Sequence, residues 1–315
     1  MFSKKLLIPL LSLSLLVTPA YSSHAAENAE AAKTSVEGQG MLSPSSSSES
    51  SESVFNGSGA GTSSEPVTDE KLETILKQVQ SQLPAENGTW AVFISDLVNG
   101  TEGSLNDQKM QAASLIKLYI MGAVYENYDQ ITGQYGRDSV DSNLYSMITV
   151  SDNDAANTLT TYLGGGDSAA GMQAVNSFCQ AHGYDQTHMG RMLLASNEND
   201  DNYTSVGDCG HLLQEIYKQD TSGYTHAADM FNLLKAQTRC NKIPAQLPEG
   251  VKTANKTGEL DNVENDAGII YDSKNDIVIV FMSQNLSSAG SAQNTIATLS
   301  LSLIHISEPT RRVVI

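Results

Sequence analysis

The stretch AASLIKLYIMGAV, residues 112–124, predicts a buried helix because almost all of its side chains are apolar. Its polar members Ser114 and Lys117 are three residues apart, which places the lysine amine near the serine hydroxyl on one helix face. A serine becomes a nucleophile when a base takes its proton. A lysine among apolar neighbours and near a second cation, for which Lys256 is a candidate, loses its proton near neutral pH. The pair therefore indicates a nucleophilic serine. The alternative is an ordinary helix start with a surface lysine.

A second polar triplet, Ser151-Asp152-Asn153, follows the apolar residues 144–150 and precedes Ala155. This context predicts a turn or helix start with Asp152 or Asn153 as the N-cap. Capping explains the aspartate, but it does not explain why a serine and an amide stand together there. In a catalytic site, Ser151 would relay a proton to a leaving nitrogen and Asn153 would hold a substrate amide.

The third triplet, Lys256-Thr257-Gly258, precedes the strand-like run AGIIY at residues 267–271. On an edge strand, the lysine and threonine can bind a substrate carboxylate, and a glycine lets substrate approach the backbone closely. The alternative is a solvated edge strand that carries a lysine as protection against aggregation.

The three motifs are Ser-x-x-Lys from Ser114, Ser-Asp-Asn from Ser151 and Lys-Thr-Gly from Lys256. They occur in the order used by penicillin-recognising serine acyltransferases, and the chain resembles the class A β-lactamase family and its relatives among the penicillin-binding proteins. Two further stretches support the resemblance. The sequence WAVFISDL at residues 90–97, with the turn Asn99-Gly100, is similar to the family's opening hairpin. The sequence IPAQLP at residues 243–248 is similar to the segment before the Lys-Thr-Gly strand. The resemblance covers roughly residues 67–300.

The resemblance implies a catalytic role for four residues. Ser114 would be the acylated nucleophile, and Lys117 would be its base or the partner of that base. Ser151 would carry a proton to the leaving nitrogen. Lys256 would complete the site on the edge strand.

The resemblance also implies how substrate is bound. Asn153 would bind the acyl amide, and Thr257 with Lys256 would hold the substrate carboxylate beside Gly258. The backbone N–H groups of Ser114 and Glu259 would form the oxyanion hole, where each donor is typically worth about 3 kcal/mol.

The chain departs from the class A pattern at the loop that supplies the deacylating glutamate. The stretch after Arg191 reads MLLASNE at residues 192–198, with no glutamate at the matching place. Asn197 matches the asparagine of the family motif, Glu198 is out of register, and the loop from Glu198 to Tyr203 is shortened. The resemblance therefore supports acylation but not fast hydrolysis of the acyl-enzyme.

Two further departures affect the walls of the site. The segment between Ser114 and Ser151 is shorter than in typical class A enzymes, and Glu259 stands where they have a small residue. We expect Glu259 to repel a substrate carboxylate or attract a substrate amine.

Three functions remain open. The first is a secreted serine hydrolase of class A β-lactamase type that hydrolyses β-lactams. The second is a D-Ala-D-Ala peptidase acting on cell-wall peptide, or a slowly deacylating penicillin-binding protein. The third is a non-catalytic binding or sensor module, which the three intact motifs disfavour.

The N-terminus predicts export. Lys4 and Lys5 precede an apolar segment from Leu6 to Val17, and Ser23-His24-Ala25 is a small-x-small cleavage site. We expect a signal peptide at residues 1–25, a secreted or cell-envelope location, and no membrane insertion after cleavage; the alternative is an uncleaved anchor. Residues 26–66, rich in Ser and Glu, predict a disordered linker.

Residues 67–301 predict a single β-lactamase-like serine hydrolase domain of the α+β class, with an antiparallel sheet flanked by helices and a cleft beside a helical subdomain. Strands are expected at residues 89–97, 101–105, 263–271 and 277–283, the last two joined by a turn at 273–275. A C-terminal helix is expected from Ala289. Residues 302–315 resemble translated sequencing adapter, and Pro309 ends the helix there, so we expect this tail to be non-native.

The net charge and the positions of the histidines indicate which ligands the protein does not bind. The formal net charge of −18 disfavours nucleic acid and anionic membranes. The six histidines are scattered, so neither a metal nor another cofactor is expected. The expected ligand is a β-lactam or a cell-wall peptide, bound by a monomer. From the family's helix order we favour a disulfide between Cys209 and Cys240 with Cys179 buried, and three unpaired thiols are the alternative.

Overall fold

The computed structural model of the protein describes residues 70–271 and 276–307. The predicted signal peptide, the linker, the turn at 273–275 and the last eight residues of the tail lie outside this part of the chain. Those expectations therefore remain predictions.

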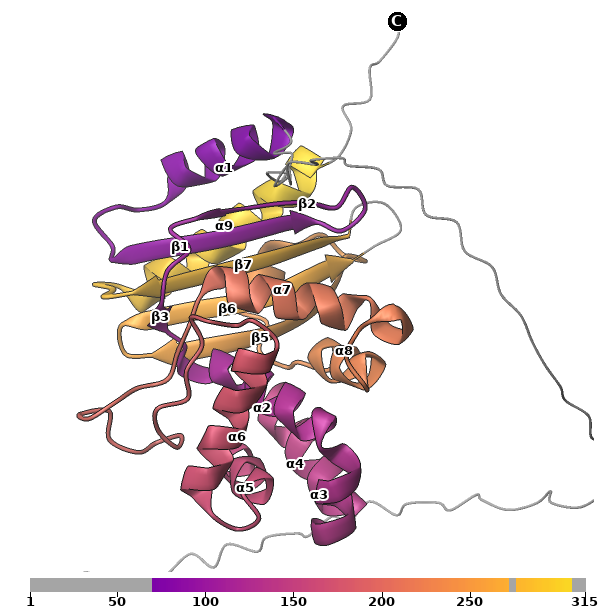
Figure 1. Ribbon diagram of the computed structural model, residues 1–315. Coiled ribbons are helices and arrows are strands. Elements are labelled where there is room, and N and C mark those ends of the chain that lie inside the picture. The colour runs from indigo at the N-terminus through magenta and orange to yellow at the C-terminus, as the bar shows by residue number, and fades with distance from the viewer. Residues whose placement is uncertain (1–69, 272–275, 308–315) are drawn as a thin grey trace, which may run out of the picture. The chain divides into compact units, whose positions relative to one another are not determined.

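A five-stranded antiparallel sheet forms the centre of the described chain (Figure 1). Its order is β2-β1-β7-β6-β5, which places β5 at an edge and pairs β1 with β7 from the other end of the sequence. The strand bounds are β1 Thr89–Asp96, β2 Thr101–Leu105, β5 Lys252–Leu260, β6 Val263–Tyr271 and β7 Ile277–Gln284. The expected hairpin forms between β1 and β2, and its Gly100 adopts a φ of 70°.

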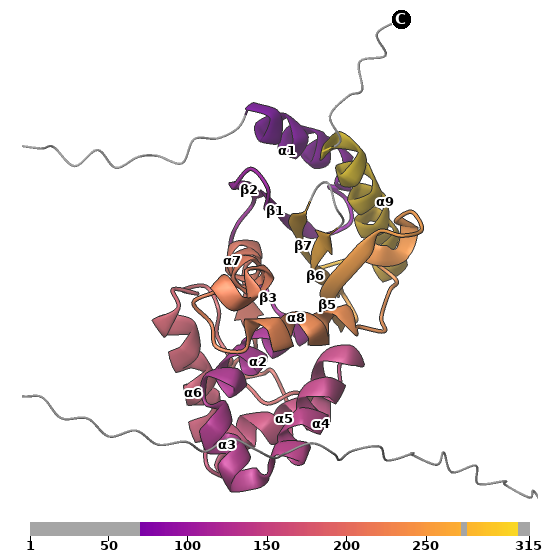
Figure 2. The same cartoon turned by 90° about the vertical axis from the view of Figure 1, so that its right-hand side faces the viewer.

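Both faces of the sheet are apolar, so helices cover each of them. Adjacent residues of β1 show the division, because Val92 packs with α1 (Glu70–Gln82) and α9 (Ala289–Ser307), whereas Phe93 packs in the cluster that includes α7 (Val206–Tyr217). Figure 2 shows α1 and α9 on one side of the sheet and α7 with the other helices on the opposite side.

The helix predicted from residues 112–124 lies at the centre of the helical part. It begins as a 3-10 turn, η1 (Ala113–Leu115), and continues as α2 (Ile116–Glu126), in which every residue from Ile116 to Tyr125 is buried. The helices around it are α3 Tyr128–Tyr135, α4 Arg137–Thr149, α5 Asn153–Leu163, α6 Ser168–Ala181 and α8 Ala227–Lys235. The α+β architecture expected from the sequence is confirmed.

The C-terminal helix begins at Ala289, and its last described residue, Ser307, precedes Pro309, which the sequence predicts to end the helix. Leu303 is buried in the cluster with α1, because an apolar side chain falls on the inner face there. A two-stranded sheet of β3 (Met110–Gln111) and β4 (Tyr203–Thr204) was not predicted, since strands of two residues have no periodicity to detect. The remaining short elements are the 3-10 turns η2 Gln219–Thr221 and η3 Ile243–Gln246.

The expected disulfide between Cys209 and Cys240 is wrong, because all three cysteines carry free thiols. Cys209 is fully buried in α7, where its sulfur contacts the hydroxyls of Tyr119 and Thr204. Cys240 lies on the surface beyond α8, while Cys179 is buried as expected. Within residues 70–271 and 276–307, no helix has the length and apolar character required to cross a membrane.

Candidate active site

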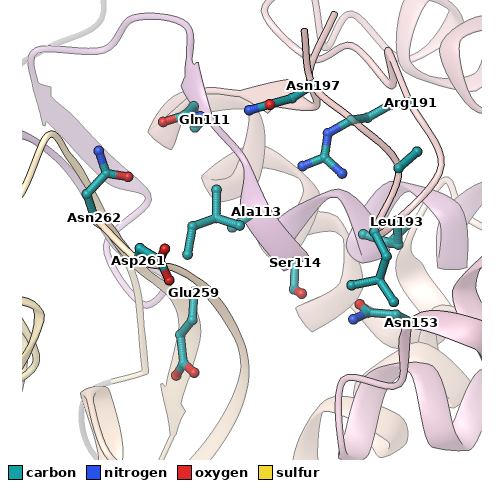
Figure 3. A pocket seen from close by; sticks show the side chains of 13 residues that line it. Gln111, Ala113, Ser114, Asn153, Arg191, Leu193, Asn197, Glu259, Asp261 and Asn262 are labelled. Atoms are coloured by element: carbon teal, nitrogen blue, oxygen red, sulfur yellow. The ribbon is translucent and has the colours of Figure 1, made fainter.

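Ser114 lies at the wall of a cavity of about 510 Å³ between η1, the loop after Arg191 and the end of β5 (Figure 3). The backbone at the preceding residue, Ala113, has a φ of 47°, a conformation that is uncommon for residues with a side chain. Such backbone positions concentrate at functional sites, where the surrounding structure stabilises them. The serine is therefore held at the start of a buried helix with its side chain toward the cavity.

Lys117 is completely buried, and its amine contacts both Ser114 and the Ser151-Asp152-Asn153 motif. The Nζ atom lies 2.7 Å from the Ser151 carbonyl oxygen, 2.7 Å from Asn153 Oδ1, 3.1 Å from Ser151 Oγ and 3.2 Å from Ser114 Oγ. A neutral amine has two N–H donors and one lone pair. The two short contacts use both donors, which leaves the lone pair for the hydroxyls.

The surroundings of Lys117 favour this neutral form. Burial is the main cause that lowers its pKa, the charge of Arg239 lowers it further, and Asp152 opposes them, with the result at about 7. Arg239, a residue that no motif in the sequence identified, is therefore a cation that acts on this lysine. Lys256, the expected candidate, also interacts with Lys117, because the charges of the two lysines repel each other across Ser151.

The Ser151-Asp152-Asn153 triplet forms the turn that begins α5. Asp152 is the N-cap and accepts a hydrogen bond of 2.8 Å from the Ala155 N–H, as the sequence predicts. Ser151 has a φ of 62°, and its hydroxyl meets the two buried lysines. The cap thus fixes the position of two polar side chains that do not themselves cap the helix.

Lys256 approaches Ser151 from the edge strand β5. It is fully buried, and its Nζ donates to Ser151 Oγ at 2.8 Å and to the Thr257 carbonyl oxygen at 2.8 Å. Burial, followed by the charges of Lys117 and Arg239, holds the pKa of Lys256 well below its usual value. Ser151 Oγ therefore lies between two lysine amines and links them.

Gly258 allows β5 to lie directly against η1. A Cβ atom at this position would be 2.9 Å from the Ala112 carbonyl oxygen and 3.2 Å from the Ser114 nitrogen. Asn265 on β6 strengthens the same contact, because its side-chain amide donates to the carbonyl oxygens of Gln111 and Ala112. Any side chain at 258 would separate the edge strand from the serine.

Glu259 follows the motif on β5, and its carboxylate is not free, contrary to the simplest reading of the sequence. It pairs with Arg239 Nη1 at 3.2 Å and with Lys242 Nζ at 3.1 Å. Burial tends to raise the pKa of Glu259, but the charges of Lys242 and Arg239 outweigh it and lower the pKa. Arg239 and Lys242 are thus the site residues that the sequence analysis missed.

The loop from Arg191 to Asn202 forms the opposite wall. An ion pair of 2.7 Å between Arg191 Nε and Asp201 Oδ1 joins the two ends of this loop. The Asn157 side chain binds both the N–H and the carbonyl of Leu193, which places this leucine beside Ser114 and Asn153 (Figure 3). The local sequence lacks a glutamate, and the structure puts an apolar side chain at this wall.

Among the described residues, the acidic side chains that line the cavity come from the β5 side. Glu259 and Asp261 line it there, whereas the 191–202 loop contributes Arg191, Leu193, Leu194, Ala195 and Asn197. Glu198, the nearest acid in the loop sequence, is exposed and does not line the cavity. In the described part of the chain, no group of His, Cys, Asp and Glu side chains could hold a metal ion.

The arrangement suits acyl transfer. Ser114 has the Lys117 amine, whose pKa is about 7, within reach of its hydroxyl proton, and Ser151 connects this amine to a second one across the cleft. The six residues from the three motifs whose side chains carry these functions lie together. They are Ser114, Lys117, Ser151, Asn153, Lys256 and Thr257.

Comparison with known proteins gives one family and a set of solved structures with the same fold. Residues 71–135 and 134–306 match the family described as the beta-lactamase enzyme family. Among solved structures, a beta-lactamase from Sphaerobacter thermophilus is 22% identical, with a TM-score of 0.63, covering 74% of this chain and 97% of that one. PBP-A is also 22% identical, with a TM-score of 0.65, covering 74% of this chain and 96% of that one.

A third solved structure is a leucine-to-glutamate mutant of PBP-A in an acyl-enzyme complex with penicillin G. It is 22% identical, with a TM-score of 0.64, and the similarity covers 74% of this chain and 96% of that one. No curated protein sequence matches the chain. These solved structures share the fold described above.

Proposed function

Because the chain belongs to the beta-lactamase enzyme family, we propose that it is a serine hydrolase of class A type that β-lactams acylate at Ser114. The observation that carries the proposal is the contact of 3.2 Å between Ser114 Oγ and an amine whose pKa is about 7. A base of this kind is half neutral near pH 7 and can take the hydroxyl proton. The fold shared with β-lactamases and PBP-A supports the same reaction.

The acylation step balances with the groups present. Ser114 Oγ attacks the β-lactam carbonyl carbon as its proton passes to Lys117 Nζ. The C–N bond of the ring then breaks, and Ser151 gives its hydroxyl proton to the departing nitrogen while it takes back the proton that Lys117 gained. The product is an ester at Ser114 with an opened ring, and Ser151 and both lysines end in their starting protonation states.

Release of this ester requires water and a base near the acyl carbon. On the loop wall beside Ser114, the side chain in place is Leu193, held by Asn157. We therefore propose slow deacylation, which makes a penicillin-binding D-Ala-D-Ala peptidase the second candidate function. Its support is the absence of a carboxylate among the described loop residues that line the cavity, together with the fold shared with PBP-A.

Intact-protein mass spectrometry of the full chain after addition of benzylpenicillin tests the proposal. We expect one adduct per chain that persists for many minutes, and no adduct on Ser114→Ala. Rapid drug consumption without an adduct would mean a fast β-lactamase with its base elsewhere. Absence of both adduct and consumption, with benzylpenicillin binding equally to wild type and Ser114→Ala, would identify a non-catalytic binding module.

We also propose that the protein is exported. The support is the sequence alone, with Lys4 and Lys5 before the apolar segment from Leu6 to Val17. Expression with its own N-terminus should yield a mature chain outside the cytoplasm that begins at Ala26. An intact N-terminus on membrane-bound protein would favour the uncleaved anchor.

A further inference from the structure

Glu259 lies beside the Lys256-Thr257-Gly258 motif, where the resemblance implies that a substrate carboxylate binds. Its side chain lines the large cavity with Ser114, and it also lines a smaller cavity of about 140 Å³ with Ser114, Ser151, Asn153, Arg239 and Thr257. Among the described residues that line this smaller cavity, Glu259 carries the one carboxylate and Arg239 the one guanidinium. The two side chains pair with each other at 3.2 Å.

Arg239 is held in this position by contacts that do not involve Glu259. Its backbone N–H donates to Gln237 Oε1 at 2.9 Å, and its Nε donates to the carbonyl oxygen of Val150, the residue before Ser151, at 3.4 Å. The backbone of Arg239 is thus fixed near the cavity, and its guanidinium has a contact besides Glu259. Glu259 is its carboxylate partner within the described part of the chain.

Lys242, the second partner of Glu259, does not depend on it. This lysine is fully buried, and Glu264 accepts its shortest contact at 2.6 Å, with the Gly258 carbonyl oxygen at 3.3 Å. Loss of the Glu259 charge would leave Lys242 neutralised by Glu264. Of the two cations, Arg239 alone would lose its counter-ion.

We propose that Glu259 is a specificity-determining residue that acts as an internal occupant of the anion subsite, against substrates with a free carboxylate next to the scissile amide. This inference rests on the proposed acylation at Ser114. A substrate carboxylate beside Thr257 must displace Glu259 from Arg239 to gain the guanidinium, or bind next to the negative charge of Glu259. A ligand whose carboxylate is esterified or amidated requires neither, so the site discriminates in favour of the neutral ligand.

The test compares acylation rates of benzylpenicillin and its methyl ester, which differ by this one charge. Glu259→Gln keeps the size of the side chain and removes the competitor. We expect the acid-to-ester rate ratio to rise about fivefold, a modest factor because Arg239 and Glu259 are 44% and 31% exposed. An unchanged ratio would overturn the proposal.

Asp261→Asn is the matched control. Asp261 lines the same large cavity and carries the same charge, but neither ion pair of Glu259, with Arg239 or with Lys242, involves it. We expect this variant to leave the ratio within about twofold, since it removes only long-range repulsion. If both variants raise the ratio equally, the change reflects the overall negative charge of the cavity, and the proposed role of Glu259 is wrong.

Arg239→Gln, combined with Glu259→Gln, completes a double-mutant cycle. In the Arg239→Gln background, Glu259→Gln should raise the ratio less than it does in wild type, because there is no guanidinium to release and only the repulsion by the Glu259 charge is removed. A rise of the same size without Arg239 would contradict the proposal. The same comparison shows whether Glu259→Gln acts through Lys242 instead, because Lys242 is present in both backgrounds.

Equilibrium binding separates this inference from the proposed function. In the Ser114→Ala chain, calorimetry should show that Glu259→Gln strengthens benzylpenicillin binding by about the same factor, with no change for the methyl ester. If this pattern appears and wild type is never acylated, the proposed enzymatic function fails and the subsite assignment stands. If wild type is acylated and the binding pattern is missing, the subsite assignment fails alone.

Discussion

In the proposed function, the chemistry of Ser114 depends on Lys117, because the amine lies within reach of the hydroxyl and can accept a proton. The i, i+3 spacing on a helix was enough to predict this contact from the sequence. One cation that lowers the pKa of this lysine was not predictable. Arg239 belongs to none of the three motifs, and only the folded turn at Ser151 brings it near Lys117.

The pH dependence of acylation tests the role of Lys117. Its pKa of about 7 means that the amine is protonated at lower pH and cannot accept the serine proton. The acylation rate should therefore fall about tenfold per pH unit below pH 7 and level off above it. Stopped-flow acylation by a chromogenic β-lactam between about pH 5 and 9 measures this.

Lys117→Met is the control for that profile. Removal of a general base typically costs about 10²- to 10⁴-fold, so we expect the rate to fall by roughly 10³-fold, without an inflection near pH 7. A wild-type profile that stays flat over the same pH range would assign the base to another group.

Among the elements, the loop from Arg191 to Asn202 forms the wall beside Ser114 on which the proposed slow deacylation rests. The sequence predicted its lack of a suitably placed glutamate, but it did not show which side chain takes the wall beside Ser114. That position depends on the contacts of Asn157 with Leu193, across two segments far apart in the chain.

Leu193→Glu should convert a persistent adduct into a short-lived one. It places a carboxylate beside Ser114 and Asn153, where it can activate a water molecule, so the lifetime of the benzylpenicillin adduct should fall at least about tenfold. Leu193→Gln has the same size without a base and should leave the lifetime near that of wild type. Equal lifetimes for the two variants would show that the loop wall does not limit deacylation.

The strands and helices themselves followed from local patterns to different degrees. Alternation and β-branched residues predicted β1, β6 and β7 to within about one residue at each end. Pro309 predicted where α9 ends, but the burial of Leu303 was not predicted, because it depends on α1 from the other end of the chain. Tertiary packing of this kind overrides a local reading.

Two apolar clusters of the whole molecule lie on either side of the sheet and determine which cysteines are exposed to solvent. The family resemblance suggested a bond between Cys209 and Cys240, but the first of these thiols faces Tyr119 and Thr204 in the interior. Burial raises the pKa of Cys209 to about 12 and also raises the pKa of Cys179, so both react poorly as thiolates.

Thiol counting tests this arrangement. Without reductant, we expect one fast-reacting thiol per native chain, lost in Cys240→Ser, and three per chain after denaturation. A single thiol in the denatured, unreduced protein would restore the disulfide that the structure excludes.

The pairing of β1 with β7 has a consequence for the order in which the protein becomes active. A ribosome makes Ser114, Lys117 and Ser151 long before Lys256, and β1 has only β2 beside it until β7 emerges. Under the proposed function, the nascent chain cannot react until Lys256 is in place, and closure of the sheet requires the two ends of the domain to meet, a slow event in topologies rich in distant contacts. For an exported chain, such a delay would keep the polypeptide unfolded while it is threaded through a translocation pore.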